Sequence, residues 1–324
     1  MLKKALTGIT QWDTAVEISG VTKTFTQWQR ENTGQGVLKN LFKPQKKIIT
    51  ALDDVSFTVK RGEFVAYAGP NGAGKSTTMK LLAGMLQPTS GSVRVKEMSP
   101  DKERIKLMKR LGVLFGNRTE LWWDHPVSQS FEWKKVVWAI PDDVYRKNLE
   151  MVTELLDIGD LLKTFVRELS LGQRMKADLA MLLLHSPEII LLDEPTLGLD
   201  VVAKRQMIDF LKKINRESGV TIIVTSHDMD DLEEMAERII MIANGKIAYD
   251  GGFDGLRNIT RNNTKVVVTT DSGISEYEVN LETNPINSLL RQLSEMEGLK
   301  DIEIRKAPIE QVIAELYGTW RGNI

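Results

Sequence analysis

The feature that most constrains the fold is a glycine-rich run at residues 69–76, which reads G-P-N-G-A-G-K-S. It follows a short apolar segment at 63–68 that is expected to be a strand, and it leads into 76–86, which is expected to be a helix. In that setting, glycines let backbone N–H groups turn inward around phosphate oxygens at the N-terminus of a helix. The run therefore predicts a phosphate-binding loop, and a tight glycine turn without a ligand is the weaker alternative.

Two side chains of this loop carry chemistry of their own. Lys75 can place a positive charge against the β- and γ-phosphates of a nucleotide, and the Ser76 hydroxyl can ligate Mg²⁺. The residues expected to contact the nucleotide in this segment are Gly69, Asn71, Gly72, Ala73, Gly74, Lys75, Ser76 and Thr77.

A second motif, at 189–194, is an apolar run that ends in two carboxylates. If the run is a strand, its tip places Asp193 beside the phosphate loop, where the carboxylate can hold Mg²⁺ through water. Glu194 is then free to polarise a water molecule for attack on the γ-phosphate. The alternative is a buried strand with a solvated acidic turn, and the glycine loop makes that interpretation the weaker one.

A third motif, Ser170-Leu171-Gly172-Gln173, precedes a predicted helix and lies 23 residues before Asp193. Ser170 can cap this helix, so the run could mark only a helix start. It can also form a second phosphate-binding helix terminus that docks onto a γ-phosphate held by another chain. In that case one chain holds two half-sites and no complete site, and the protein must dimerise to work.

Apolar periodicity alternates between strand and helix along the chain, which implies a mostly parallel α/β sheet. The expected strands are 15–18, 52–59, 63–68, 112–115, 188–193, 220–225, and a hairpin of 239–243 with 246–249. The expected helices are 76–86, 128–140, 142–157, 173–185, 201–218 and 229–236. The helical block at about 99–169 is expected to be an insertion into the sheet.

The C-terminal tail has a different pattern. Strands are expected at 265–269, 276–279 and 302–304, and helices at 286–295 and 308–316. A tail of this kind is expected to be a small α+β domain that regulates, dimerises or only stabilises, and its residues do not decide among these roles.

The motifs together resemble those of the nucleotide-binding subunits of ATP-binding-cassette (ABC) transporters. The segments that carry the resemblance are 69–77, 169–173, 189–195, 198–200 and 225–228. Their order and spacing match over about residues 14–255. The resemblance implies a P-loop ATPase that binds ATP and Mg²⁺, with an antiparallel β subdomain and an inserted α-helical subdomain beside the core sheet. It also implies that two chains, identical or paralogous, sandwich two ATP molecules and drive separate membrane permeases.

Three further residues take expected roles from this resemblance. His227 matches the switch histidine that senses the γ-phosphate and helps position the attacking water, and it follows a strand expected to neighbour the Asp193 strand. Asp200 matches the loop that communicates between the two sites, and it can also cap the helix that follows. Phe25 stands where the family stacks an aromatic ring on adenine, and the alternative is a buried aromatic side chain.

Asn117 departs from the family pattern, because it falls where the family has a glutamine that reaches Mg²⁺ and the attacking water. Asn keeps the amide but is one methylene shorter, so its contact with metal and nucleotide becomes weaker or water-mediated. Slow or tightly gated hydrolysis is the expected consequence.

Tryptophan is concentrated just after this position, with four of the chain's seven at 122, 123, 133 and 138. In the family this helical region receives a cytoplasmic helix of the permease, and exposed aromatics are favoured interface anchors. We expect Trp122 and Trp123 near that groove and Trp133 and Trp138 more internal, the alternative being that all pack inside the subdomain. The Leu-Trp-Trp-Asp stretch also resembles the type-2 exporter subgroup, which favours export over import.

The predicted organisation is an N-terminal segment at 1–13, an ABC ATPase domain at 14–256 and the C-terminal α+β domain at 257–324. The ATPase domain contains a basic insertion at 26–48 and a helical subdomain at about 97–180. Within the insertion, residues 38–47 place four lysines around three large apolar residues. This segment is either a solvated basic loop or a surface element near anionic lipid headgroups.

The composition of the chain excludes several kinds of site and partner. The 324-residue chain contains no cysteine, which excludes disulfides, thiol catalysis and cysteine-based zinc sites. Its net charge of −1 gives no basic field, so no nucleic-acid partner is expected. No run reaches the ~18 apolar residues of a membrane helix, so the expected location is peripheral, on the cytoplasmic face of the membrane. The alternatives are an importer ATPase and, less favoured, a soluble ABC ATPase acting on ribosomes or DNA.

Overall fold

The computed structural model describes residues 14–29, 45–116, 119–259, 263–271, 273–280, 291, 293 and 298–305. The chain divides into two compact units, Met1–Asp250 and Gly251–Ile324. The expected domain boundary at 256/257 falls inside helix α9 (Phe253–Ile259).

The first unit is built around a six-stranded sheet with strand order β5-β6-β7-β3-β8-β9. Its strands are β3 (Phe64–Ala68), β5 (Leu111–Phe115), β6 (Ile189–Asp193), β7 (Thr221–Thr225), β8 (Arg238–Ala243) and β9 (Lys246–Gly252). The pairs from β5 through β8 are all parallel, which confirms the mostly parallel core sheet. β3 and β7 are buried along their whole length, as expected for parallel strands that are covered on both faces.

A three-stranded antiparallel sheet of order β2-β1-β4 adds a second layer. Its strands are β1 (Thr14–Gln29), β2 (Gln45–Lys60) and β4 (Ser90–Val95). β1 and β2 pair as far as Gln29 with Gln45, so both strands run well into the segment expected to be a basic insertion. Residues 30–44 lie outside the described part of the chain.

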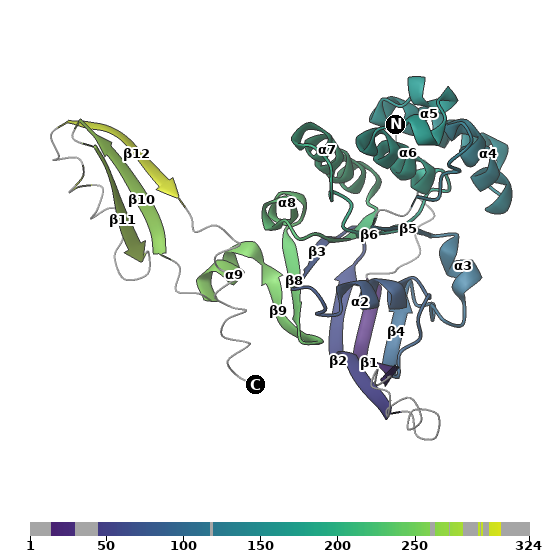
Figure 1. Cartoon of the computed structure of the whole chain (residues 1–324), viewed down its shortest axis with the longest axis horizontal. Helices are drawn as coiled ribbons and strands as arrows, with labels where there is room; N and C mark the ends of the chain where they lie inside the picture. The colour runs from purple at the N-terminus through teal and green to yellow at the C-terminus, as the bar shows by residue number, and fades with distance from the viewer. Residues whose placement is uncertain are drawn as a thin grey trace, which may run out of the picture. The chain divides into compact units, whose positions relative to one another are not determined.

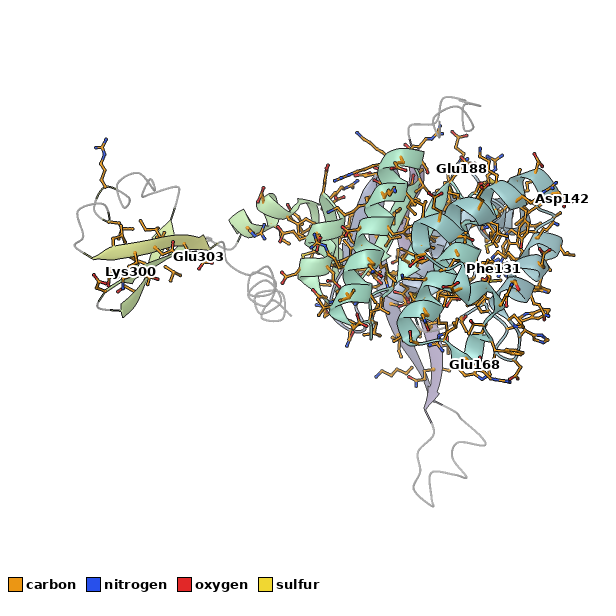
Figure 2. All side chains as sticks on the ribbon, turned by 90° about the horizontal axis from the view of Figure 1, so that it is seen from above. Phe131, Asp142, Glu168, Glu188, Lys300 and Glu303 are labelled. Carbon is orange, nitrogen blue, oxygen red and sulfur yellow. The ribbon has the colours of Figure 1, made fainter. Side chains whose placement is uncertain are left out.

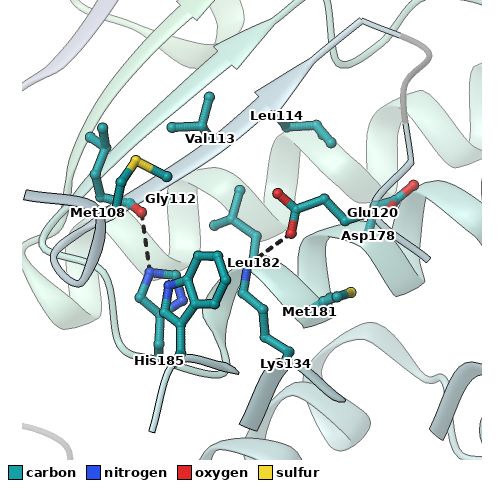
Figure 3. A pocket seen from close by; sticks show the side chains of 12 residues that line it. Met108, Gly112, Val113, Leu114, Glu120, Lys134, Asp178, Met181, Leu182 and His185 are labelled. Atoms are coloured by element: carbon teal, nitrogen blue, oxygen red, sulfur yellow. Dashed lines mark hydrogen bonds and ion pairs between the residues drawn. The ribbon is translucent and has the colours of Figure 1, made fainter. Parts of the chain in front are cut away.

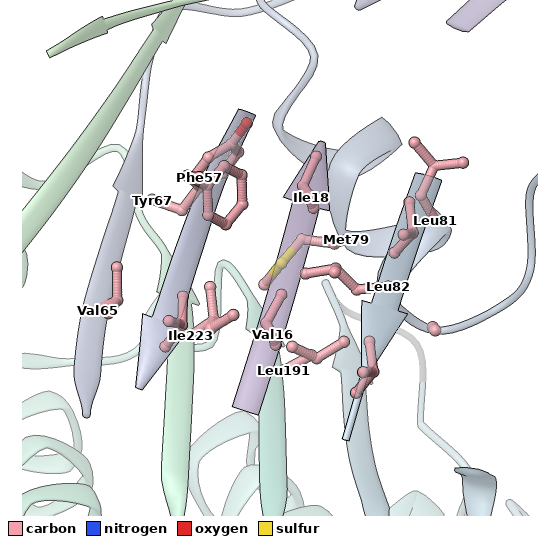
Figure 4. Packing of buried hydrophobic residues seen from close by; sticks show 14 of the residues in the cluster. Val16, Ile18, Phe57, Val65, Tyr67, Met79, Leu81, Leu82, Leu191 and Ile223 are labelled. Atoms are coloured by element: carbon pink, nitrogen blue, oxygen red, sulfur yellow. The ribbon is translucent and has the colours of Figure 1, made fainter. Parts of the chain in front are cut away.

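Helix α2 (Lys75–Leu82) lies between the two sheets. It is shorter than the expected 76–86, because Gly84 adopts a left-handed φ of +64° just after the C-cap. Met79 and Leu82 are fully buried and pack with residues of both sheets, including Ile18 and Leu191 (Figure 4). The phosphate loop is therefore attached to a helix that is anchored between the two sheets.

The remaining helices surround the parallel sheet. They are α3 (Arg104–Met108), α4 (Val127–Val137), α5 (Asp142–Leu156), α6 (Leu171–Leu183), α7 (Val201–Ser218) and α8 (Met229–Met235), with short 3-10 turns at Asp160–Lys163 and Val166–Glu168. Figure 1 shows α2 on one side of this sheet and α6 and α7 on the other. Phe131 of α4 is fully buried inside the helical layer, and Asp142 lies at its outer edge (Figure 2). In the sequence, α4 to α6 fall between strands β5 and β6, as expected of an inserted helical block.

The second unit contains α9 and a three-stranded antiparallel sheet of order β11-β10-β12. The strands are β10 (Asn263–Thr270), β11 (Gly273–Asn280) and β12 (Leu299–Arg305), and they contain all three strands expected in the tail. Val266, Val268 and Leu293 form its core among the described residues. Arg291 and Leu293 are helical, as expected for 286–295, whereas the helix expected at 308–316 lies outside the described residues.

Among the residues that the structure describes, no helix is both long and apolar enough to cross a bilayer.

Replacing Met79 with alanine tests the importance of the buried position of α2. Met79→Ala should lower the free energy of unfolding by about 2–5 kcal/mol, because the side chain is fully buried between two sheets and leaves a cavity. Chemical denaturation measures this change. Lys80→Ala, at an exposed position of the same helix, should shift stability by no more than about 0.5 kcal/mol. Equal effects of the two substitutions would contradict the layered arrangement.

Candidate active site

The phosphate loop connects strand β3 to helix α2, and two glycines fix its shape. Gly72 and Gly74 have φ angles of +80° and +115°, a region that residues with a Cβ rarely adopt. A Cβ on Gly74 would also lie 2.6 Å from Leu52 Cδ2 and 2.7 Å from the Ala51 carbonyl oxygen. A Cβ on Gly72 would meet no atom within 4 Å. A side chain at Gly74 would therefore clash with Leu52 and Ala51, so glycine is required there. The space next to Gly72 is open.

Lys75 is the first residue of α2 and is only 6% exposed. Its Nζ donates hydrogen bonds to the carbonyl oxygens of Gly69 at 2.6 Å and Pro70 at 3.3 Å, so it lies inside the loop. Burial lowers the pKa of Lys75, and the nearby carboxylates of Glu194 and Asp193 oppose that shift. The loop thus holds a cation close to the two carboxylates that the sequence singled out.

Asp193 and Glu194 are positioned by the pairing of β6 with β7, in which Asp193 lies opposite Thr225. The Thr225 hydroxyl donates to Asp193 Oδ1 at 2.6 Å and accepts from the Glu194 backbone N–H at 3.0 Å. Glu194 has a φ of +58°, a strained conformation for a residue with a side chain. The strand therefore ends sharply at Asp193, and the next carboxylate leaves the sheet in a new direction.

His227 meets Glu194 directly. Its Nε2 lies 2.6 Å from Glu194 Oε1, and because a carboxylate only accepts, the imidazole is the donor. The expectation that the strand before His227 neighbours the Asp193 strand is confirmed. The contact itself was not predicted, because it depends on the register of two strands that are far apart in the sequence.

These residues fit a magnesium–nucleotide complex. The N-terminus of α2 and the Lys75 ammonium supply positive charge for phosphates, next to the open space at Gly72. The exposed Ser76 hydroxyl and the Asp193 carboxylate are hard oxygen ligands of the kind that Mg²⁺ prefers. The described residues contain no group of three or more acidic or histidine side chains that could hold a metal ion.

The third motif forms a separate group at the start of α6. Ser170 caps this helix in a capping box: its Oγ accepts from the Gln173 N–H at 3.3 Å, and Gln173 Oε1 accepts from the Ser170 N–H at 2.9 Å. Asp200 caps α7 by accepting from the Ala203 N–H at 2.8 Å. The two helix starts touch, because a Cβ on Gly172 would lie 3.2 Å from Ala203 Cβ. The expected capping roles of Ser170 and Asp200 are thus present.

Phe25 and Asn117 are the two remaining residues that were expected to contact the nucleotide or its metal. Phe25 is 38% exposed, with Lys23 Nζ 5.2 Å from its ring centre, so the alternative of a buried aromatic is wrong. Asn117 lies outside the described residues. The residue before it, Gly116, donates its N–H to the Asp193 carbonyl oxygen at 2.8 Å.

The four tryptophans of the helical region differ in solvent exposure in the way that was expected. Trp122 and Trp123 are 39% and 52% exposed, whereas Trp133 and Trp138 are half-buried, so the four do not all pack inside the subdomain. The Trp122 and Trp133 rings lie 5.6 Å apart, and the Arg174 guanidinium lies 5.8 Å from the Trp123 ring. The contact with Arg174 brings this aromatic surface to the first turn of α6, which sequence reasoning missed.

A small cavity of about 20 Å³ lies between β5 and the helices α4 and α6 (Figure 3). Its lining includes Lys134, which is buried and pairs with Glu120 at 2.8 Å. Burial raises the pKa of Asp178 to about 7 and lowers that of His185 to about 4. The cavity is too small for a nucleotide, so these buried titratable groups belong to the structural joint between the helices and the sheet.

Residues 52–197 match the family model described as ABC transporter. The chain is 32% identical over 215 residues to the ABC transporter ATP-binding protein NatA of Bacillus subtilis (strain 168), covering 66% of this chain and 87% of that protein. The chain belongs to the ABC transporter ATP-binding proteins. This ABC subunit is therefore an ATP-hydrolysing enzyme, with ATP as its substrate and Mg²⁺ as its metal.

Other relatives of this ABC subunit extend the comparison. It is 31% identical over 221 residues to the methionine import ATP-binding protein MetN of Carboxydothermus hydrogenoformans, covering 66% of this chain and 65% of that protein. Among solved structures, the ATP-binding cassette MJ0796, described as a dimer in a post-hydrolysis state bound to ADP and Pi, matches with a TM-score of 0.60 and 26% identity. That match covers 73% of this chain and 98% of the cassette.

The buried Asp178 carboxyl makes stability depend on pH. Because its folded pKa is raised to about 7 from the ordinary 3.8, the folded state binds more protons between these values, and stability falls as pH rises through that window. Asp178→Asn should remove this pH-dependent loss in the free energy of unfolding, which is at most about 4 kcal/mol over the whole window between the two pKa values. Urea denaturation at pH 5 and pH 8 measures it. The exposed Asp143→Asn should leave the fall unchanged, and an unchanged fall in Asp178→Asn would contradict the assignment.

Proposed function

We propose that this ABC ATPase dimerises around two ATP molecules and drives export through separate permease subunits, with Lys75, Glu194 and His227 as its catalytic residues. The observation that carries the proposal is the 2.6 Å contact between His227 Nε2 and Glu194 Oε1 at the carboxyl ends of two parallel strands. A carboxylate that can accept a proton, oriented by a hydrogen-bond donor near a phosphate loop, is suited to activate a water molecule for attack on a phosphate.

In this proposal each residue has one task. The backbone N–H groups of Gly69 and of residues 71–77 bind the phosphates together with the Lys75 ammonium. Ser76, Asp193 and Asn117 hold Mg²⁺, which neutralises phosphate charge when bound. Glu194 takes a proton from the attacking water. His227 orients the Glu194 carboxylate, senses the γ-phosphate and helps to position the attacking water. Phe25 stacks on adenine, which its exposed ring supports.

The second chain completes each site. Ser170, Gly172 and Gln173 of one chain face the γ-phosphate on the phosphate loop of the other, and Asp200 links the two sites. The exposed position of Ser170 at a helix start supports this, as does the dimeric state of the related cassette. The partner is an identical chain or a paralogue.

The direction of transport and the permease contact rest on the helical region. We assign Trp122 and Trp123, both exposed, to the groove that receives a cytoplasmic segment of the permease. The Leu-Trp-Trp-Asp stretch favours the type-2 exporter subgroup, and the alternative is import, the activity for which the relative MetN is named. In this arrangement the ATPase domain at 14–256 sits on the cytoplasmic face of the membrane, and residues 257–324 form an accessory domain.

The substitution Glu194→Gln tests the hydrolytic site and the dimer together. Gln keeps the size of the side chain but cannot take a proton, so ATP turnover should fall by about 10²-fold or more. With Mg²⁺ and ATP the variant should accumulate as a dimer in light scattering after gel filtration. Glu217→Gln, an exposed change on α7, should behave as the unmodified chain. A Glu194→Gln chain that stays monomeric with ATP would refute the shared site.

Replacing Trp122 and Trp123 with alanine tests the permease groove. The double variant should lose most of its co-purification with the permease from detergent-solubilised membranes, because buried aromatics carry much of an interface's affinity. Its ATP-dependent dimerisation in the Glu194→Gln background should persist. Val136→Ala with Val137→Ala removes another exposed apolar pair of the same region and should leave co-purification unchanged. Undiminished co-purification without both tryptophans would count against the groove.

A further inference from the structure

Lys204 connects helix α7 to the loop that carries His227. Its Nζ lies 2.6 Å from Asp228 Oδ2 and 3.1 Å from Asp231 Oδ2. Asp228 directly follows His227 and caps helix α8 by accepting from the Asp231 N–H. One ammonium group therefore holds the first turn of α8, and with it the residue next to His227.

The same lysine lies one turn after Asp200, in the part of α7 that contacts α6. Lys204 donates its backbone N–H to the Asp200 carbonyl oxygen, so the two residues share one helical turn. The start of α7 touches the start of α6 through Ala203 and Gly172, and a Cβ on Gly198 would lie 3.0 Å from Leu171. A displacement of this α6–α7 face, residues 170–173 and 198–203, is therefore carried to Lys204 through a rigid helical turn.

The positive charge of Lys204 compensates two carboxylates that lie close to it, those of Asp228 and Asp231. The Asp231 side chain is 8% exposed, and those of Lys204 and Asp228 are about a quarter and two-fifths exposed. The hydrogen bond to Asp228 raises the pKa of Lys204, and burial raises that of Asp231 against the influence of Lys204 and Thr196. Without the ammonium, two neighbouring carboxylates face each other with no cation between them, and the start of α8 loses its tie to α7.

We infer that Lys204 is a positioning residue, which holds His227 against Glu194 and links that contact to the α6–α7 face that meets the second chain. The inference rests on the proposed function of His227 and of the dimer. It explains how a change at the dimer contact can alter the hydrolytic pair of the same chain, through groups that never touch the nucleotide.

The neighbouring residue Arg205 supplies a matched control. Its Nη1 lies 2.9 Å from Glu234 Oε1, so it also bridges α7 and α8, but its side chain is 65% exposed and its partner lies a turn further from His227. A general loosening of the two helices should therefore follow either substitution, whereas displacement of His227 should follow only the loss of Lys204.

The experiment compares Lys204→Met, Lys204→Arg and Arg205→Met in the full-length chain. For Lys204→Met we expect kcat for ATP to fall about tenfold or more with KM changed by less than about twofold, because the phosphate loop is untouched. Lys204→Arg should recover most of kcat, and Arg205→Met should keep wild-type kcat. Adding Asp228→Asn, which keeps the cap, to Lys204→Met should cause little further loss.

The outcomes separate the inference from the function on which it rests. A His227→Ala chain with wild-type turnover overturns the role of His227 and the inference with it. If His227→Ala loses turnover while Lys204→Met keeps it, only the inference is overturned. It is also overturned if Arg205→Met is impaired as much as Lys204→Met, if KM rises in place of a fall in kcat, or if the losses from Lys204→Met and Asp228→Asn are additive.

Discussion

The structure of the site depends on the parallel register between β6 and β7. Because Asp193 lies opposite Thr225, one hydroxyl serves both the Asp193 carboxylate and the Glu194 backbone N–H. Glu194 and His227 then leave the same edge of the sheet a few residues later and meet. A slip of one residue would turn Asp193 to the other face of the sheet and separate this pair. Apart from Asp193, the residues of both strands are buried, so the chemistry is placed at the end of two buried strands.

The phosphate loop depends on burial from two sides. Helix α2 is only two turns long, which is too short to be stable alone, and it is held because both sheets cover it. The end that carries Lys75 is therefore fixed relative to β6, and the ammonium can lie inside the loop near two carboxylates. The antiparallel sheet carries Phe25, which we propose stacks on adenine, and it also completes the cover over the helix that presents the phosphate loop.

Much of this arrangement could be predicted, because short apolar runs such as Ile189–Asp193 and Thr221–Thr225 favour buried strands. Prediction from the sequence missed the strand segments whose side chains are mostly exposed, because these segments carry no apolar pattern. β1 and β2 extend to residues 29 and 45 with exposed side chains at Thr26, Ile48 and Ile49, so backbone pairing maintains the ladder and no apolar pattern marks it. β4 buries only Val93 and Val95 and was missed. The hydrogen bond from His227 to Glu194 depends on three-dimensional register, which no local pattern contains.

The capping role of Ser170 and its proposed phosphate contact are compatible, because they use different parts of the same groups. In the capping box, Ser170 Oγ accepts from the Gln173 N–H, and Gln173 Oε1 accepts from the Ser170 N–H. Both of these side-chain oxygens act as acceptors there, which leaves the Ser170 hydroxyl proton and the Gln173 amide protons as donors. Phosphate oxygens only accept, so donors are what a partner's nucleotide needs from this helix start. The capping box thus orders both side chains in the folded chain. The conformational entropy of these side chains is therefore lost on folding and not on binding of a phosphate.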